Sequence, residues 1–187
     1  MSERVLNTQV ANLWYHDLGE EDPMIILGEG DPMTAMTPIE VAMRFVGVKE
    51  VSGSGSNAMI LSMLQLDNKS AKGDEVTWCS AFVNYIAWLF RLPRSKSLAA
   101  RSWLGVGNPI RIPKEGEVVE WYAGDVVILK RGSGEQPGPE VLNAPGHVGF
   151  FMRRDGSTVY VLGGNQKDTV SVAPFPLSQV LGVRRLW

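Results

Sequence analysis

The chain has 187 residues, a formal net charge of -2 and 44% hydrophobic residues. This length and apolar content suit a single domain of ordinary size with a hydrophobic core. A charge so near neutral argues against a nucleic-acid-binding protein, and no stretch approaches the roughly 18 consecutive apolar residues of a membrane span.

The N-terminal segment has weak periodicity. We therefore expect residues 1–36 to form a weakly structured arm and residues 37–187 to form a single domain. The first residues, Met1 to Asn7, are polar and lack the apolar region of a Sec signal peptide. We therefore expect synthesis in the cytoplasm, so that a substrate outside the cell would require another route of delivery.

Four helical segments are expected next. Thr37-Pro38-Ile39-Glu40 supplies a capping Thr, a Pro at the first helical position and a Glu three residues after the cap, and Gly47 ends this helix. Asn57 is expected to cap a second helix. The third, from about Thr77 to Phe90, is apolar on nearly all sides and therefore predicted to be buried. Residues 97–104 suggest a short fourth helix.

After Gly107 the pattern changes to short apolar runs. Helices followed by strands predict an α+β fold with the N-terminal helices packed on a single antiparallel sheet. About five strands are expected, at Val126–Leu129, His147–Met152, Thr158–Leu162, Val170–Ala173 and Val180–Leu186.

Cys79 is the only cysteine, and His16 and His147 are the only histidines. A single cysteine excludes an internal disulfide and a multi-cysteine zinc site. Cys79 falls in the first turn of the buried helix, where unpaired N–H groups and the helix dipole favour a thiolate and would stabilise an oxyanion. Nucleophilic chemistry at sulfur therefore needs Cys79, with His147 or His16 as its base. We expect His16 to be an ordinary surface residue of the arm.

A third polar group should orient the His147 ring. If Asp155-Gly156 is a two-residue turn, Arg154 pairs with Ser157, and Gln166 points to the same side as His147. A three-residue loop, or a bulge at Gly163-Gly164, brings Asn165 round instead. Residue spacing alone leaves both alternatives open.

At these residues the sequence resembles the NlpC/P60–CHAP superfamily of papain-like cysteine peptidoglycan hydrolases. The similar segments are Trp78-Cys79-Ser80-Ala81-Phe82-Val83-Asn84, Gly146-His147-Val148-Gly149-Phe150 and Leu162-Gly163-Gly164-Asn165-Gln166. Two further segments, Gly47–Glu50 and Ala99–Leu104, also agree, and the resemblance runs from about Pro38 to Trp187.

The resemblance implies a papain-like fold that needs no metal or other cofactor. It implies Cys79 as nucleophile, His147 as base and then acid, and Asn165 as orienting residue with Gln166 in reserve. Trp78 and Gln166 are candidate substrate contacts, although Trp78 is as readily a core aromatic residue. The implied substrates are peptidoglycan stem peptides, cut between D- and L-residues or at the muramoyl–alanine amide.

Such an enzyme would act in the periplasm or cell wall, as a phage lysin or as an antibacterial effector that requires a cognate immunity protein. Two alternatives keep the fold: a transamidase or acyltransferase that uses the same thioester, and a non-catalytic wall-binding or phage structural module. The acidic residues Glu50, Asp74 and Glu75 are expected to be solvated charges.

Overall fold

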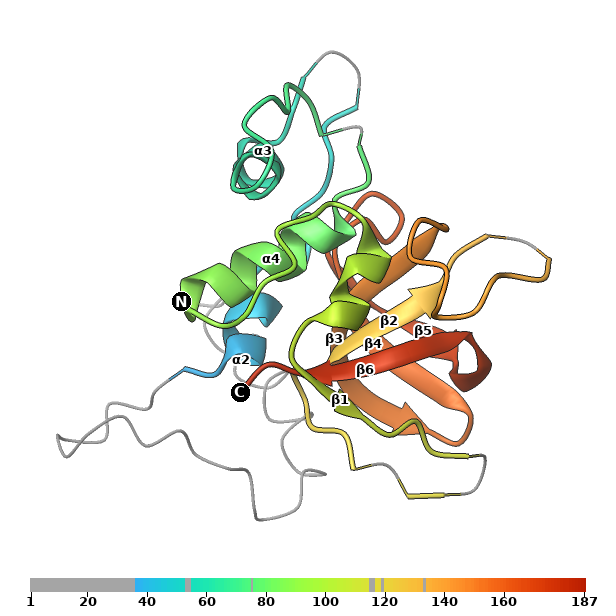
Figure 1. Cartoon of the computed structure of the whole chain (residues 1–187). Helices are drawn as coiled ribbons and strands as arrows, with labels where there is room; N and C mark the ends of the chain where they lie inside the picture. The colour runs from blue at the N-terminus through green and yellow to red at the C-terminus, as the bar shows by residue number, and fades with distance from the viewer. Residues whose placement is uncertain (1–35, 53–54, 75, 115–116, 119, 133) are drawn as a thin grey trace, which may run out of the picture. The chain divides into compact units, whose positions relative to one another are not determined.

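The computed structural model describes residues 36–187 except positions 53–54, 75, 115–116, 119 and 133 (Figure 1). His16 and the predicted arm up to residue 35 lie outside the described residues.

The predicted helix starts are confirmed. Helix α2 (Pro38–Met43) begins with a capping box, in which Thr37 accepts a hydrogen bond from the Glu40 N–H and the Glu40 carboxylate accepts one from the Thr37 N–H. Helix α3 (Ala58–Gln65) is capped by the Asn57 side chain. Helix α2 ends four residues before Gly47, because turns occupy residues 44–47.

Helix α4 (Cys79–Leu89) confirms the predicted buried helix. Eight of its 11 residues are buried, which is why its sequence shows no polar face. The expected fourth helix is a 3-10 helix, η1 (Ala100–Gly105), and a second short one, η2 (Leu177–Gln179), precedes the last strand. No helix in the described part of the chain combines the length and apolar composition that a membrane crossing requires.

The described strands form one open antiparallel sheet in the order β1-β6-β2-β3-β4-β5. They are β1 (Asn108–Ile110), β2 (Val126–Lys130), β3 (Gly146–Asp155), β4 (Thr158–Gly163), β5 (Ser171–Pro176) and β6 (Val180–Arg185). The α+β class and the single sheet are thus confirmed, with six strands instead of about five. Strand β1 escaped prediction because its three residues contain Pro109 and form no apolar run.

Both faces of the sheet are covered by apolar side chains. On β2, Val126 and Ile128 belong to the core shared with Phe82 of α4, whereas Val127 and Leu129 belong to a second cluster that includes Trp121. Burial on both faces explains why β2 appears in the sequence as an uninterrupted apolar run.

The β3–β4 hairpin differs from the expected register. Its turn is Gly156-Ser157, so that Asp155 pairs with Thr158, and a bulge interrupts the pairing between Phe151 and Arg153. Strand β4 ends at Gly163, three residues before Gln166. The chain therefore leaves the sheet before the residues that were expected to orient the His147 ring.

Candidate active site

Cys79 is the first residue of α4 and is 1% exposed. The backbone N–H of Val148 on β3 lies close enough to this residue to lower the pKa of its thiol. Because Val148 directly follows His147, this proximity places Cys79 near the peptide that joins these two residues. Helix α4 and strand β3 thus bring together two residues that lie far apart in the sequence.

Burial raises the pKa of the Cys79 thiol above its ordinary value of 9.0. The backbone N–H of Val148, the Arg131 charge and the N–H groups of Ser80 and Cys79 act in the opposite direction, but each is weaker than the burial. The N–H groups at the helix start therefore favour the thiolate, as expected, but burial outweighs them and raises the pKa of the Cys79 thiol.

The His147 ring is held in an apolar environment. It is 5% exposed and stacks on Phe175 of β5, with 5.5 Å between the ring centroids and an interplanar angle of 29°. Burial lowers the pKa of His147 from 6.5 to about 4, and the positive charge of Arg131 acts in the same direction. The ring is consequently neutral near pH 7, and a neutral ring is able to accept a proton.

Gln166 decides which ring nitrogen carries the proton. Its Oε1 lies 3.1 Å from His147 Nε2, while its amide nitrogen donates to the carbonyls of Gly163 (3.2 Å) and Ser171. Only an NH2 group can satisfy those carbonyls, so Oε1 must face the ring and accept a hydrogen bond from Nε2–H. In the neutral ring the lone pair is therefore on Nδ1.

Nδ1 makes no hydrogen bond to a described residue, and yet it is not closed off from solvent. In the described residues, the side-chain nitrogen and oxygen atoms that are fully buried and lack a hydrogen-bond partner are Asp74 Oδ1 and Arg184 Nε. His147 Nδ1 is not one of them, so this unpartnered nitrogen is not fully buried. His147 thus presents an unprotonated nitrogen that is able to accept a proton, as a general base must, although burial makes it a weaker base than ordinary imidazole.

Gln166, and not Asn165, contacts the His147 ring. Asn165 adopts a left-handed backbone conformation (φ 56°), and its Nδ2 donates a 2.7 Å hydrogen bond to Glu50 Oε1. The side chain expected to orient the ring thus points elsewhere, because the chain turns sharply after β4. The reserve candidate Gln166 takes this position, and its amide is fully engaged in holding the ring rather than free to bind substrate.

Trp78 is a core residue and not a cleft residue. It is 0% exposed, and its Nε1 donates a 2.7 Å hydrogen bond to the same oxygen of Glu50. Glu50, which was expected to be a solvated charge, is half-buried, and its carboxylate joins Trp78 to Asn165.

Asp74 was also expected to be a solvated charge, and this expectation is wrong. It is 1% exposed and accepts hydrogen bonds from the N–H groups of Asn57 (2.8 Å) and Val51 (3.3 Å). Glu75 lies outside the described residues.

Both glycines of the Gly163-Gly164 pair are required by close packing. A Cβ atom at Gly163 would lie 2.9 Å from His147 Nε2, and one at Gly164 would lie 2.4 Å from the Trp78 ring. Each residue of the Gly-Gly-Asn-Gln segment thus has a separate structural task, which residue spacing alone did not reveal.

A cleft of about 600 Å³ opens beside Cys79. Among the described residues, its walls come from the start of α4, the segment before η1 and the loop between β2 and β3. They are Thr77, Cys79, Leu98, Ala99, Ala100, Arg131, Gly132, Gln136, Asn143, Ala144, Pro145 and Gly146. A peptide segment in this cleft would lie against Cys79, whereas His147 is not among the described residues that line it.

Arg101 holds the β2–β3 loop that forms one wall. This arginine is 0% exposed, and its guanidinium donates to the carbonyls of Pro145 (3.0 Å), Gly138 (2.6 Å), Val141 (3.0 Å) and Pro137 (3.2 Å). Five fixed N–H donors make arginine suited to such a cluster of carbonyl groups. Arg101 was not among the candidate residues, although it lies in the Ala99–Leu104 segment that resembles the superfamily.

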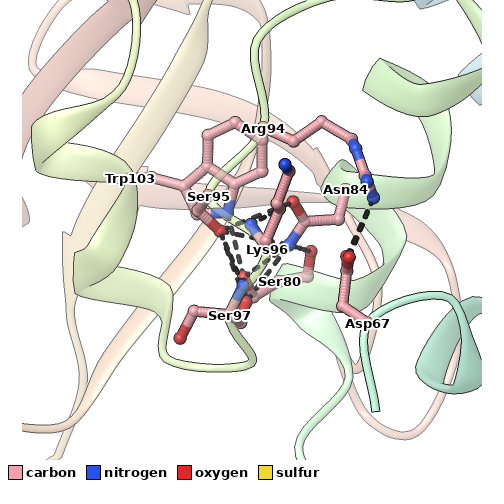
Figure 2. A network of polar contacts seen from close by, with 8 residues as sticks. All are labelled: Asp67, Ser80, Asn84, Arg94, Ser95, Lys96, Ser97 and Trp103. Atoms are coloured by element: carbon pink, nitrogen blue, oxygen red, sulfur yellow. Dashed lines mark hydrogen bonds and ion pairs between the residues drawn. The ribbon is translucent and has the colours of Figure 1, made fainter. Parts of the chain in front are cut away.

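The segment before η1, which forms another part of the cleft wall, is held by a buried polar network (Figure 2). Asn84 of α4 donates to the Ser97 carbonyl (3.1 Å) and accepts a hydrogen bond from the Lys96 N–H (3.0 Å). Ser80 Oγ donates to the same Ser97 carbonyl (2.6 Å) and accepts from Trp103 Nε1 (2.9 Å). Because Leu98 follows Ser97 directly, this network fixes the cleft wall to the helix that carries Cys79.

Across the described residues, no group of three or more His, Cys, Asp or Glu side chains is placed to hold a metal ion. No protein-family model matches the chain, and no curated protein sequence matches it significantly.

Proposed function

We propose that the protein is a cysteine-dependent amidohydrolase of bacterial peptidoglycan, with the papain-like fold of the NlpC/P60–CHAP superfamily. The observation that carries the proposal is that the backbone N–H of Val148 acts on the Cys79 thiol, while the preceding residue, His147, is held at its Nε2 by Gln166. The three sequence segments that resemble the superfamily contain all of these residues.

In the proposed reaction the Cys79 sulfur attacks the carbonyl carbon of a stem-peptide amide while its proton moves to His147 Nδ1. A neutral thiol and a neutral imidazole suit this order, since the proton is transferred as the carbon–sulfur bond forms. N–H groups at the start of α4 are the donors available to the oxyanion.

Collapse of the tetrahedral intermediate breaks the carbon–nitrogen bond, and the proton on Nδ1 passes to the leaving amine. A water molecule then gives its proton to Nδ1 and attacks the thioester. The carbon–sulfur bond breaks, a carboxylate product is released and the thiol is restored.

The substrate sets the place of action, which is the periplasm or cell wall. A phage lysin and an antibacterial effector both meet this requirement, and an effector would be blocked by an immunity protein that covers the cleft. Co-purification with the product of a neighbouring gene, compared between the parent protein and a variant with altered cleft residues, distinguishes the two roles.

Digestion of purified sacculi, with products identified by mass spectrometry, tests the proposal. We expect the parent protein to release shortened muropeptides with a new carboxylate, and Cys79→Ala and His147→Ala to release none. Arg111→Met, which alters an exposed ion pair with Glu117, is the control variant and should retain full activity. The thermal stability of Cys79→Ala should stay within about 1–2 kcal/mol of the parent.

Other products would contradict the proposal in distinct ways. An amine adduct in place of a free carboxylate would identify a transamidase. Sacculi that bind the parent protein and Cys79→Ala equally, with no shortened muropeptide, would identify a non-catalytic binding module.

A further inference from the structure

The cleft beside Cys79 carries a single sign of charge. Arg131, directly after β2, is the only charged side chain among the described residues that line it. Thr77, Gln136 and Asn143 supply the neutral polar groups of the walls. A cleft whose described lining residues include one cation and no carboxylate favours an anionic ligand.

Arg131 is available to such a ligand. It is exposed, and within the described part of the chain it has no hydrogen bond or ion pair to a protein group. The contrast with Arg101, whose guanidinium is buried against four carbonyls, is informative because the two arginines lie at the same loop. Arg101 holds the loop, whereas Arg131 leaves its donors open towards the cleft.

The charge of Arg131 also reaches the reacting groups. It lowers the pKa of both Cys79 and His147, and among the described residues no other charged side chain shifts the pKa of either group through its charge. An anion bound to Arg131 would therefore lie in the same cleft as Cys79 and within electrostatic reach of its thiol.

We propose that Arg131 binds a free carboxylate of the stem peptide and makes the enzyme selective for substrates that carry this carboxylate near the scissile amide. The planar guanidinium can bind a carboxylate through two parallel hydrogen bonds. The inference rests on the proposed hydrolase function and adds a determinant of specificity to it.

The test compares two muropeptide preparations that differ only in whether their carboxyl groups are free or chemically converted to carboxamides. We expect the parent protein to cleave the free form with a kcat/KM at least about tenfold higher, the usual effect of one charge-assisted contact. Arg131→Gln should lose this preference, mainly through a higher KM for the free form. Arg131→Lys should keep part of it, because the charge remains without the fork.

Lys130→Gln is the matched control. It removes the same charge from the neighbouring residue, which does not line the cleft, and should keep the preference of the parent protein. Thermal melting of each variant ensures that only folded proteins are compared. An unchanged preference in folded Arg131→Gln, alongside normal hydrolysis, would overturn the role of Arg131 and leave the hydrolase function intact.

Binding measurements test the carboxylate site independently of the proposed hydrolase activity. Calorimetry with Cys79→Ala and with the double variant Cys79→Ala/Arg131→Gln measures affinity for both preparations without turnover. Tighter binding of the free form that depends on Arg131 would support the carboxylate site even if the parent protein cleaved neither preparation. Equal affinities in the two variants would contradict it.

Discussion

At the scale of single residues, the Gln166 amide is the clearest link between the chain and the proposed chemistry. Its NH2 group is surrounded by the carbonyls of Val161, Gly163 and Ser171, so its oxygen can only face His147. The tautomer of the ring is thus set by the backbone around β4 and β5 and not by the ring itself.

We expect Gln166→Ala to lower kcat by about tenfold or more, because the ring loses the acceptor that fixes its orientation and tautomer. Asn165→Ala should lower kcat much less and act mainly on stability, since it removes a hydrogen bond to Glu50. Steady-state kinetics and thermal melts of both variants check this. A larger loss of kcat in Asn165→Ala would contradict the assignment of Gln166.

The pKa of His147 makes stability depend on pH. The ring titrates at about 4 when folded and near 6.5 when unfolded, so between these values the unfolded chain binds more protons. Its contribution to the free energy of unfolding is therefore complete above about pH 6.5 and is lost as the pH falls to 4, by an amount on the order of 3 kcal/mol. Denaturant titrations across this range measure it.

His147→Gln is the control for this pH dependence, since it removes the titrating group and should flatten the curve between pH 4 and 6.5. Phe175→Ala should weaken the dependence, because water then reaches one face of the ring and raises the pKa of His147 towards 6.5. Identical pH slopes in the parent protein and His147→Gln would show that another group is responsible.

At the scale of elements, Arg101 joins η1 to the loop that forms one wall of the cleft. We expect Arg101→Met to destabilise the fold by roughly 2–4 kcal/mol, because four carbonyls lose their donor. Residues 137–145 should then be cut faster by proteases and exchange their amide hydrogens faster. Limited proteolysis and hydrogen exchange monitored by mass spectrometry report on this loop directly.

Arg111→Met is again the matched control, because the Arg111–Glu117 ion pair is largely exposed, with 69% and 38% of the side chains accessible. Its free energy of unfolding should change by no more than about 1 kcal/mol. Equal protease sensitivity of the loop in the two variants would show that Arg101 is not what holds it.

The elements that the sequence predicted well are those with strong local signals. The capping box at Thr37 and the continuous apolar surface of α4 depend only on neighbouring residues. Strand β1 and the hairpin register were missed because they depend on distant pairing: β1 exists only through its contact with β6, and the bulge near Met152 shifts every pair beyond it.

At the scale of the whole molecule, the last strand lies in the interior of the sheet, between β1 and β2 (Figure 1). Arg185 at its end donates to both carboxylate oxygens of Asp125, at 2.9 and 2.7 Å, and Asp125 is 0% exposed. This ion pair fixes the end of the described chain to the start of β2, 60 residues earlier in the sequence.

We expect Arg185→Met to cost about 3–5 kcal/mol, because it leaves the Asp125 carboxylate buried without its counter-charge. Arg184→Met is the matched control: its Nε is buried and unpaired in the described part of the chain, so its replacement should change stability little. Denaturant unfolding of the two variants measures the difference. Similar losses in both would show that the ion pair contributes little to the fold.

The sequence by itself determined the α+β class, the helix starts and the choice of Cys79 and His147 as the residues proposed to react, because one cysteine and one histidine in recognisable segments leave few alternatives. Tertiary structure alone decided that Gln166 holds the ring, that Trp78 is core and that Arg131 faces the cleft. These depend on where the chain leaves β4 and how it packs, and such long-range geometry is not encoded in residue spacing. Burial, which also depends on tertiary structure, raises the pKa of Cys79 and lowers that of His147. At Cys79 this effect outweighs that of the N–H groups at the helix start.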